Sequence, residues 1–216
     1  MPKKPVGQVG PFVVEQTAEG ATAEWKKIAW PDDKSAQEQF VMDCFVEEFR
    51  KRGATIHKAI QNEENNFDFR IETPGGDINV DLTEFVYSDG KGNPFEREGT
   101  WVNCLHCAKA LASLVTKKSD HYGRRGDVPI DLVVYATHWR FRPDHTTIAL
   151  AKTILKAKRL TMENVFLVLP LGHKRATFHL LYPTDKDVLG GKSLDDYKDT
   201  RWLPIDPAGF KLERDG

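Results

Sequence analysis

The sequence predicts a single α/β domain, with a mixed central sheet and flanking helices. Three observations point to this fold class. Three long segments carry apolar residues at helical spacing, and short segments rich in β-branched and aromatic residues lie between them. The first three short segments follow one another directly, whereas the later ones alternate with helices. Consecutive strands favour an antiparallel meander and a strand-helix-strand unit favours a parallel pair, so we expect both kinds of neighbour in one sheet.

The predicted helices have recognisable boundaries. The first spans 35–52, because Ser35-Ala36-Gln37-Glu38 matches a capping box and Gly53 supplies a stop signal. The second runs from Thr100 to Lys118, where apolar residues recur every three or four positions. A third is expected over 146–158, between two strands.

The predicted strands complete the order helix, three strands, helix, strand, helix, strand, with a further candidate strand at the end. The strand segments are Ala54–Ile60, Phe67–Glu72, Ile78–Tyr87, Asp131–Ala136, Val165–Leu169 and Ala176–Tyr182. The segments 131–136 and 165–169 are almost continuously apolar, which is typical of strands covered on both faces.

Length and composition set the domain organisation and exclude some functions. A chain of 216 residues is expected to form one domain, here 31–183, with an N-terminal arm at 1–30 that is loose over its first twenty residues and a C-terminal extension at 184–216. The formal net charge of -1 gives no global attraction to polyanions, so any nucleic-acid contact must be local. No apolar run is long enough to cross a membrane and the start lacks the apolar core of a secretory signal, so we expect a cytoplasmic protein with no membrane contact.

The three cysteines do not predict a disulfide framework. Their odd number favours a reducing compartment. Cys104-Leu105-His106-Cys107 has the spacing of half a zinc site, but no second ligand pair follows and the segment lies in a helical pattern. We therefore expect Cys104 and Cys107 to be small buried helix residues.

Two acids on neighbouring strands are the strongest functional signal. Asp68 and Asp81 lie on segments joined by the turn Thr73–Asp77. Because side chains alternate along a strand, both acids point away from the apolar layer and toward a shared side. Oxygen ligands of this kind suit a hard divalent cation, Mg²⁺ or Mn²⁺. The alternative is two solvated strand acids.

The first helix contributes a third acid. A rotation of 100° per residue places Glu48 in the middle of the apolar face. A buried carboxylate must be neutral, paired or bound to a metal. The alternative to a metal ligand is a salt bridge to an Arg or Lys at the sheet edge.

This pattern resembles the PD-(D/E)XK nuclease superfamily, also called the restriction-endonuclease-like fold, over about residues 35 to 170. The matching positions are Asp68 on the second strand, Asp81-Leu82-Thr83 on the third, and Glu48 on the first helix. The resemblance implies that Glu48, Asp68 and Asp81 hold Mg²⁺ or Mn²⁺ for phosphodiester hydrolysis in DNA or RNA. Many such nucleases act as dimers, so the resemblance also implies a homodimer.

The sequence departs from the family pattern at Thr83, where the family usually has a catalytic lysine. In some members this lysine is supplied by the following helix, where Lys109 and Lys118 flank the apolar face. We favour Lys118 over Lys109. The alternative for either lysine is an ordinary surface position.

Three loop segments combine basic and aromatic residues that could contact phosphates and bases: Lys51-Arg52, Tyr122–Gly126 and His138–Arg142. Two competing interpretations stay open. The chain could be a catalytically inactive member of the fold that binds nucleic acid or a protein, which Thr83 favours. It could also be an unrelated α/β protein, although no P-loop, dinucleotide or nucleophile-elbow motif is present.

Overall fold

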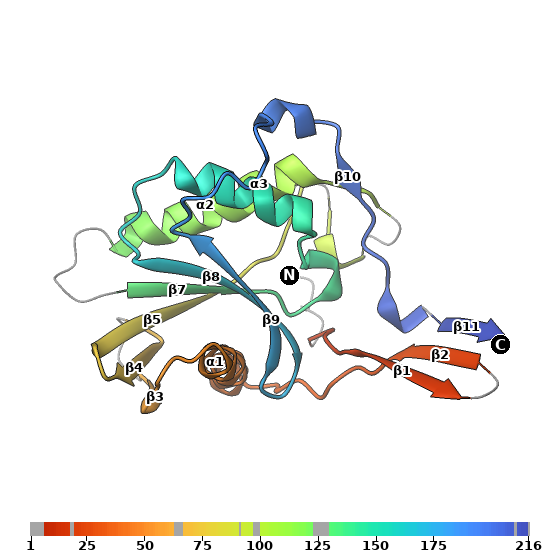
Figure 1. Ribbon diagram of the computed structural model, residues 1–216, viewed down its shortest axis with the longest axis horizontal. Helices are drawn as coiled ribbons and strands as arrows, with labels where there is room; N and C mark the ends of the chain where they lie inside the picture. Colours follow the sequence, from red (N-terminus) through yellow and green to blue (C-terminus); the bar gives the residue numbers. More distant parts are fainter. Residues whose placement is uncertain are drawn as a thin grey trace.

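The computed structural model describes residues 7–17, 20–62, 67–90, 92–96, 100–122, 130–209 and 211–215. Its centre is a six-stranded sheet with the strand order β3-β4-β5-β7-β8-β9 (Figure 1). The strands are β3 (Lys58–Gln61), β4 (Phe69–Thr73), β5 (Gly76–Glu84), β7 (Ile130–Tyr135), β8 (Asn164–Gly172) and β9 (Arg175–Tyr182). β5, β7 and β8 run parallel, and the outer neighbours pair antiparallel. The predicted mixed sheet is confirmed.

Helices cover both faces of this sheet. α1 (Lys34–Lys51) lies on one face, while α2 (Cys104–Tyr122) and α3 (His145–Lys156) lie together on the other (Figure 1). The central strand β7 is buried along its whole length, so its side chains alternate between two apolar layers. Leu132 and Val134 belong to the layer under α2 and α3, and Val133 belongs to the layer under α1.

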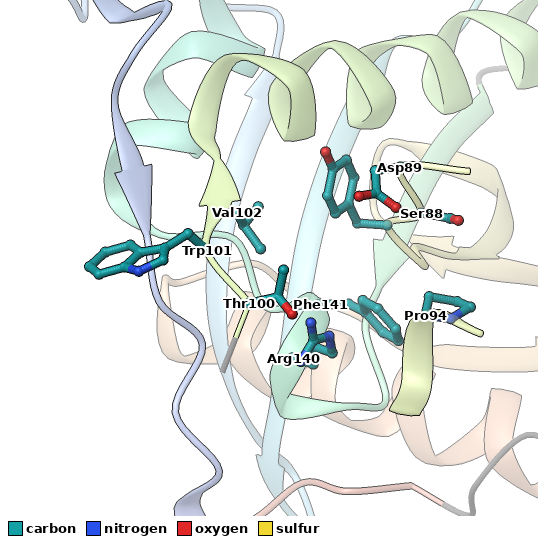
Figure 2. A pocket seen from close by; sticks show the side chains of 9 residues that line it. Ser88, Asp89, Pro94, Thr100, Trp101, Val102, Arg140 and Phe141 are labelled. Atoms are coloured by element: carbon teal, nitrogen blue, oxygen red, sulfur yellow. The ribbon is translucent and has the colours of Figure 1, made fainter. Parts of the chain in front are cut away.

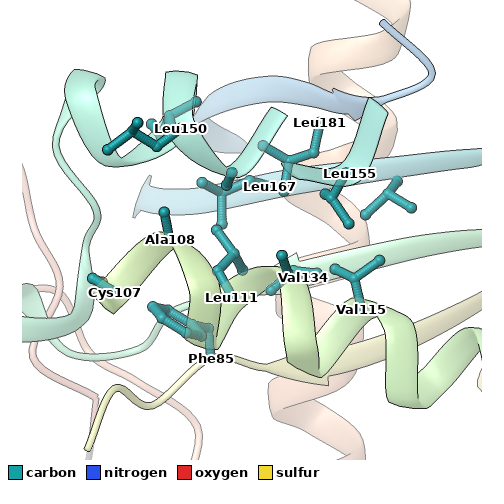
Figure 3. Packing of buried hydrophobic residues seen from close by; sticks show 14 of the residues in the cluster. Phe85, Cys107, Ala108, Leu111, Val115, Val134, Leu150, Leu155, Leu167 and Leu181 are labelled. Atoms are coloured by element: carbon teal, nitrogen blue, oxygen red, sulfur yellow. The ribbon is translucent and has the colours of Figure 1, made fainter. Parts of the chain in front are cut away.

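The layer under α2 and α3 is the larger core. Leu111 and Val115 of α2 point toward Val134 of the sheet, and Leu155 of α3 lies beside Leu167 (Figure 3). All these side chains are fully buried. The spacing that predicted α2 therefore reports the face that packs on the sheet.

The cysteines are buried free thiols, as expected. Cys104 and Cys107 belong to the core under α2, and Cys44 lies under α1 against the Gly172 carbonyl oxygen. Burial raises the pKa of Cys44 to about 11 and also raises the pKa of Cys107. All three thiols therefore stay protonated at neutral pH and serve packing.

The start of α1 differs from the prediction. Asp33 is the N-cap, and its Oδ2 accepts a hydrogen bond from the Ala36 backbone N–H at 2.9 Å. Ser35, predicted to cap the helix, lies inside its first turn and donates to Gln61 Oε1 of β3 at 2.8 Å. Asp33 and Ser35 are both good capping residues, and their close spacing left the first residue of the helix ambiguous.

The N-terminal segment is the largest correction to the predicted fold. The first twenty residues were expected to be loose, but β1 (Phe12–Thr17) and β2 (Gly20–Trp25) form an antiparallel hairpin that β11 (Lys211–Asp215) extends (Figure 1). β1 exposes Phe12 and Val14 on one side, so no buried face gives the alternating signal of a strand.

Other short elements connect these units. β6 (Val102–Asn103) pairs with β10 (Arg201–Trp202), so the C-terminal segment also contacts the residues that immediately precede α2. The short 3₁₀ helices are η1 (Pro94–Glu96), η2 (Trp139–Phe141), η3 (Leu194–Tyr197) and η4 (Pro207–Gly209). Within the described ranges, no helix has both the length and the apolar character that a membrane span requires.

Candidate functional site

The strand register brings Asp68 and Asp81 together. Phe69 of β4 pairs with Val80 of β5, so one further step places the two acids opposite each other. Asp68 Oδ2 accepts a hydrogen bond from the Leu82 backbone N–H at 2.6 Å. The Asp68 carboxylate thus takes the place of the backbone carbonyl oxygen to which Leu82 would donate if β4 continued. This hydrogen bond holds the carboxylate beside β5.

Burial and repulsion perturb this pair of acids. Burial is the main cause that raises the pKa of Asp68 to about 6, and the charge of Asp81 and a side-chain hydrogen bond to it add to the shift. The Leu82 N–H opposes the shift only in part. Asp68 therefore retains much of its proton up to weakly acidic pH.

Lys118 is the cation of the site. Its Nζ donates to Asp81 Oδ2 at 2.8 Å, and the side chains of Lys118 and Asp81 are 31% and 5% exposed. Lys118 belongs to the last turns of α2, and its aliphatic stem reaches from the helix to the sheet. Lys109 is exposed and lies nine residues earlier, about 14 Å along the helix axis, so it does not reach the same acids.

Thr83 and Glu84 flank the pair on β5. Thr83 is half-buried and shares the face of Asp81, as the alternation predicted. Glu84 lies on the opposite face, where its Oε1 accepts a hydrogen bond from Thr137 Oγ1. Burial raises the pKa of Tyr135, and the negative charges of Glu84, Glu38 and Asp68 raise it further. Acidic groups therefore gather at this end of the sheet on both faces.

Glu48 does not join the site. Its carboxylate accepts from Lys51 Nζ at 2.8 Å and from Arg52 Nη1 at 3.0 Å. Burial acts to raise the pKa of Glu48, but these two cations together outweigh it and lower the pKa. Glu48 thus forms a salt bridge, which was the predicted alternative to binding a metal. Its cations, Lys51 and Arg52, come from the end of α1 rather than from the edge of the sheet.

Glu38, rather than Glu48, is the acid of α1 that acts on the site. Its charge contributes to the raised pKa of Asp68. Lys34 pairs with Glu38 at 3.3 Å, and its pKa is raised mainly by Glu38 and further by the charges of Asp68 and Asp81. Glu38 was interpreted as a capping residue. At 100° per residue, Glu38 lies about 60° around the helix from Val41 and therefore near the apolar face. This position in the sequence could have identified Glu38 as an acid that faces the sheet. Glu48 lies about 15 Å further along the axis.

The donors of the site suit magnesium. Among the described residues, no three His, Cys, Asp or Glu side chains lie close enough together to hold a metal. Mg²⁺, however, is commonly held by one or two carboxylates while it keeps several waters. Burial, and after it the charge of Asp81, raises the pKa of Asp68, and a divalent cation between the two carboxylates would offset both effects.

The segment His138–Arg142 does not form an exposed contact region for nucleic acid. His138 and Arg140 are buried, and burial, followed by the charge of Arg140, lowers the pKa of His138 to about 4. Arg140 lies beside Phe141 in a small pocket from which Trp101 points away (Figure 2). Its volume of about 40 Å³ has room for water but not for a base. Lys51 and Arg52 are bound to Glu48, and the expected contact region 123–126 lies outside the described residues.

Comparisons with known proteins do not assign a function to this chain. No family model matches the chain, and no curated protein matches it. Among solved structures, the chain is similar to SfsA from Pyrococcus furiosus in complex with Ca²⁺. The identity is 14%, the match covers 78% of this chain and 75% of that chain, and the TM-score is 0.29.

Proposed function

We propose that this chain is a Mg²⁺-dependent nuclease of the PD-(D/E)XK type. One observation carries the proposal: the carboxylates of Asp68, the residue immediately before β4, and of Asp81 on β5 share a site with the ammonium group of Lys118. The order of helix, three strands, helix and strand around this site is the order that the resemblance implies. Thr83, at the usual lysine position, is compensated by Lys118 from the next helix.

Each residue has a distinct role in this proposal. Asp68 and Asp81 would hold the cation, which when bound supplies a Lewis acid that neutralises phosphate charge and activates water. Asp68 is fixed by the Leu82 N–H and Asp81 by Lys118, so the two oxygens are positioned before a ligand arrives. The Lys118 ammonium group would bind a phosphate oxygen and stabilise the negative charge that develops there.

The substrate would be DNA or RNA, because a diester bond supplies the anionic oxygen that Lys118 and a cation both bind. Net charge near zero implies that attraction to the polyanion is local to this site. A homodimer is the assembly in which two such sites would cut two strands. Mn²⁺ would replace Mg²⁺ because both prefer carboxylate and water ligands.

A second candidate function is a catalytically inactive protein of the same fold that binds nucleic acid or a protein. The absence of a third metal-ligating side chain in a cluster with Asp68 and Asp81, within the described part of the chain, favours it. So does the direct ion pair of Lys118 with Asp81, which satisfies both charges without a ligand.

The test is cleavage of single-stranded DNA, duplex DNA and RNA in Mg²⁺, in Mn²⁺ and in EDTA. We expect cleavage only with a divalent metal, and a loss of at least about 100-fold in Asp81→Asn and in Lys118→Gln. Asp77→Asn is the matched control, because Asp77 is an exposed acid of the same strand that pairs with Arg70 at 3.7 Å. Undiminished cleavage by Asp81→Asn would end the assignment.

Metal binding gives a readout that does not depend on activity. Mg²⁺ should raise the midpoint of thermal unfolding of the wild type and of Asp77→Asn, but not of Asp68→Asn or Asp81→Asn. If the wild type binds nucleic acid with the same affinity in Mg²⁺ and in EDTA and never cleaves it, the inactive binding protein is the better description.

A further inference from the structure

A second cavity lies away from the carboxylate pair. Its volume is about 520 Å³, which is within the usual range for small-molecule sites. The β1–β2 hairpin, the segment after β7 and the C-terminal segment line it together. Its walls are mainly aromatic and apolar and include Phe12, Trp25, Trp139 and Ile205, with Arg142 as a charged residue among them.

The cavity lies beyond the carboxyl ends of two strands of the central sheet. Trp139 follows the carboxyl end of β7, and Leu171 lies at the carboxyl end of β8. These two strands are parallel neighbours. The cavity is therefore bounded by the segment that follows β7 and by the end of β8.

The aromatic walls are held in place and remain open to a ligand. Trp25 Nε1 donates to the Gly10 carbonyl oxygen at 3.1 Å, and the Trp139 backbone N–H donates to the Gln8 carbonyl oxygen at 3.1 Å. Phe12 is 50% exposed and Ile205 is 62% exposed. A Trp25 indole that is held by its Nε1 hydrogen bond, beside exposed apolar side chains, favours a flat apolar ligand, because burial of such a ligand removes apolar surface from water with little ordering of the protein.

Arg142 supplies the charge of the cavity. Its Nη1 donates to the Pro170 carbonyl oxygen at 3.2 Å, which leaves further donors of the guanidinium group. Burial is the cause that lowers the pKa of Arg142, and within the described residues no acid offsets that burial. A partly desolvated arginine that lacks a carboxylate partner favours an anionic ligand.

We propose that this cavity binds a small planar aromatic anion, with its ring against Trp25 and Trp139 and its anionic group on Arg142. This proposal does not rest on the nuclease proposal, because it uses none of the residues of the carboxylate site. The anionic group could be a carboxylate or a phosphate, since a guanidinium group binds either in a bidentate manner.

The experiment is isothermal titration calorimetry of the full chain with three probes that share one ring system. 2-Naphthoate carries a carboxylate, 2-naphthyl phosphate carries a phosphate, and 2-naphthamide is neutral. We expect at least one anionic probe to bind with a Kd on the order of 1 mM or below. The neutral probe should bind about ten-fold more weakly. The tighter of the two anions identifies the class of anionic group.

Variants separate the cavity from unspecific binding. Arg142→Gln keeps a long polar side chain and should weaken the anionic probes about ten-fold, while leaving the neutral probe unchanged. Arg201→Gln removes an exposed charge beside Trp202 of the cavity and should leave all three probes unchanged. Trp139→Leu should weaken all three, because it removes an aromatic wall.

Several outcomes would overturn the proposal. One is that no probe binds at concentrations up to about ten times the expected Kd. The others are equal affinity for the neutral and anionic probes, and equal losses of affinity in Arg142→Gln and Arg201→Gln. If Arg142→Gln fails to fold, as judged by circular dichroism, Arg142→Lys replaces it. A lysine keeps the charge but loses the bidentate geometry, so an unchanged affinity in that variant would also overturn the bidentate contact.

Discussion

Asp68→Asn should stabilise the protein at neutral pH in the absence of metal. Asparagine keeps the shape of the side chain: its Oδ1 can accept from the Leu82 N–H, and its amide can donate to Asp81. It removes the carboxylate whose burial and repulsion raise its pKa. The variant therefore tests whether the two acids are strained against each other.

The magnitude follows from the pKa shift. The pKa of Asp68 rises from its ordinary 3.8 to about 6 in the folded protein. Two pKa units correspond to about 3 kcal/mol as an upper limit. Because Asp68 is partly exposed, solvent screening reduces the expected effect to about 1 to 1.5 kcal/mol.

The sign of the pH dependence follows from linkage. A raised folded-state pKa means that the folded state holds the proton more tightly than the unfolded state. The stability that Asp68 contributes is therefore fully present below about pH 3.8 and is lost as the pH rises through about 6. The advantage of Asp68→Asn should be near zero at pH 3.5 and reach its full value above pH 7.

The assay is urea unfolding followed by tryptophan fluorescence, in EDTA, at pH 3.5, 5 and 7.5. Asp77→Asn, at an exposed position of β5, should change the free energy of unfolding by less than about 0.5 kcal/mol at each pH. A lower stability of Asp68→Asn than of the wild type at pH 7.5, or an advantage that is the same at every pH, would show that the Asp68 carboxylate is not destabilising.

Three further predictions concern stability. Lys118→Met leaves Asp81 buried without its cation and should cost about 2 kcal/mol at pH 7.5 in urea unfolding, and a cost below about 0.5 kcal/mol would show that the ion pair is weak. Trp202→Phe removes an indole Nε1 that is buried without a hydrogen-bond partner among the described residues, so the free energy of unfolding in urea should change little or rise, whereas a loss above about 2 kcal/mol would reveal an unseen partner. Asp33→Ala should cost about 1 kcal/mol and more than Ser35→Ala in the same urea assay, and the reverse order would restore Ser35 as the cap of α1.

The fold could be predicted because its main signals are local. The apolar spacing of α2 and the continuous apolar runs of β7 and β8 depend on residues that are close in sequence. The β1–β2–β11 sheet could not be predicted in the same way, because it joins the two ends of the chain and its strands expose apolar residues.

The candidate site was predictable on the sheet but not on the first helix. Alternation along two strands places Asp68 and Asp81 on one side, and rotation along α2 places Lys118 at the edge of its apolar face. Rotation along α1 gives the direction of an acid around the helix but not its height along the axis. The height is set by how α1 docks on the sheet: Glu38 is the acid of α1 whose charge contributes to the raised pKa of Asp68, whereas Glu48 pairs with Lys51 and Arg52.

The pairing of β11 with β2 also orders the events of folding during synthesis. Lys211 pairs with Glu24, which precedes it by almost the whole length of the chain. While the ribosome is still adding residues, β2 can pair with β1 but its second edge has no strand to meet. That edge is completed only after β11 has been synthesised, so until then the hairpin of a nascent chain is open to pairing with a neighbouring chain.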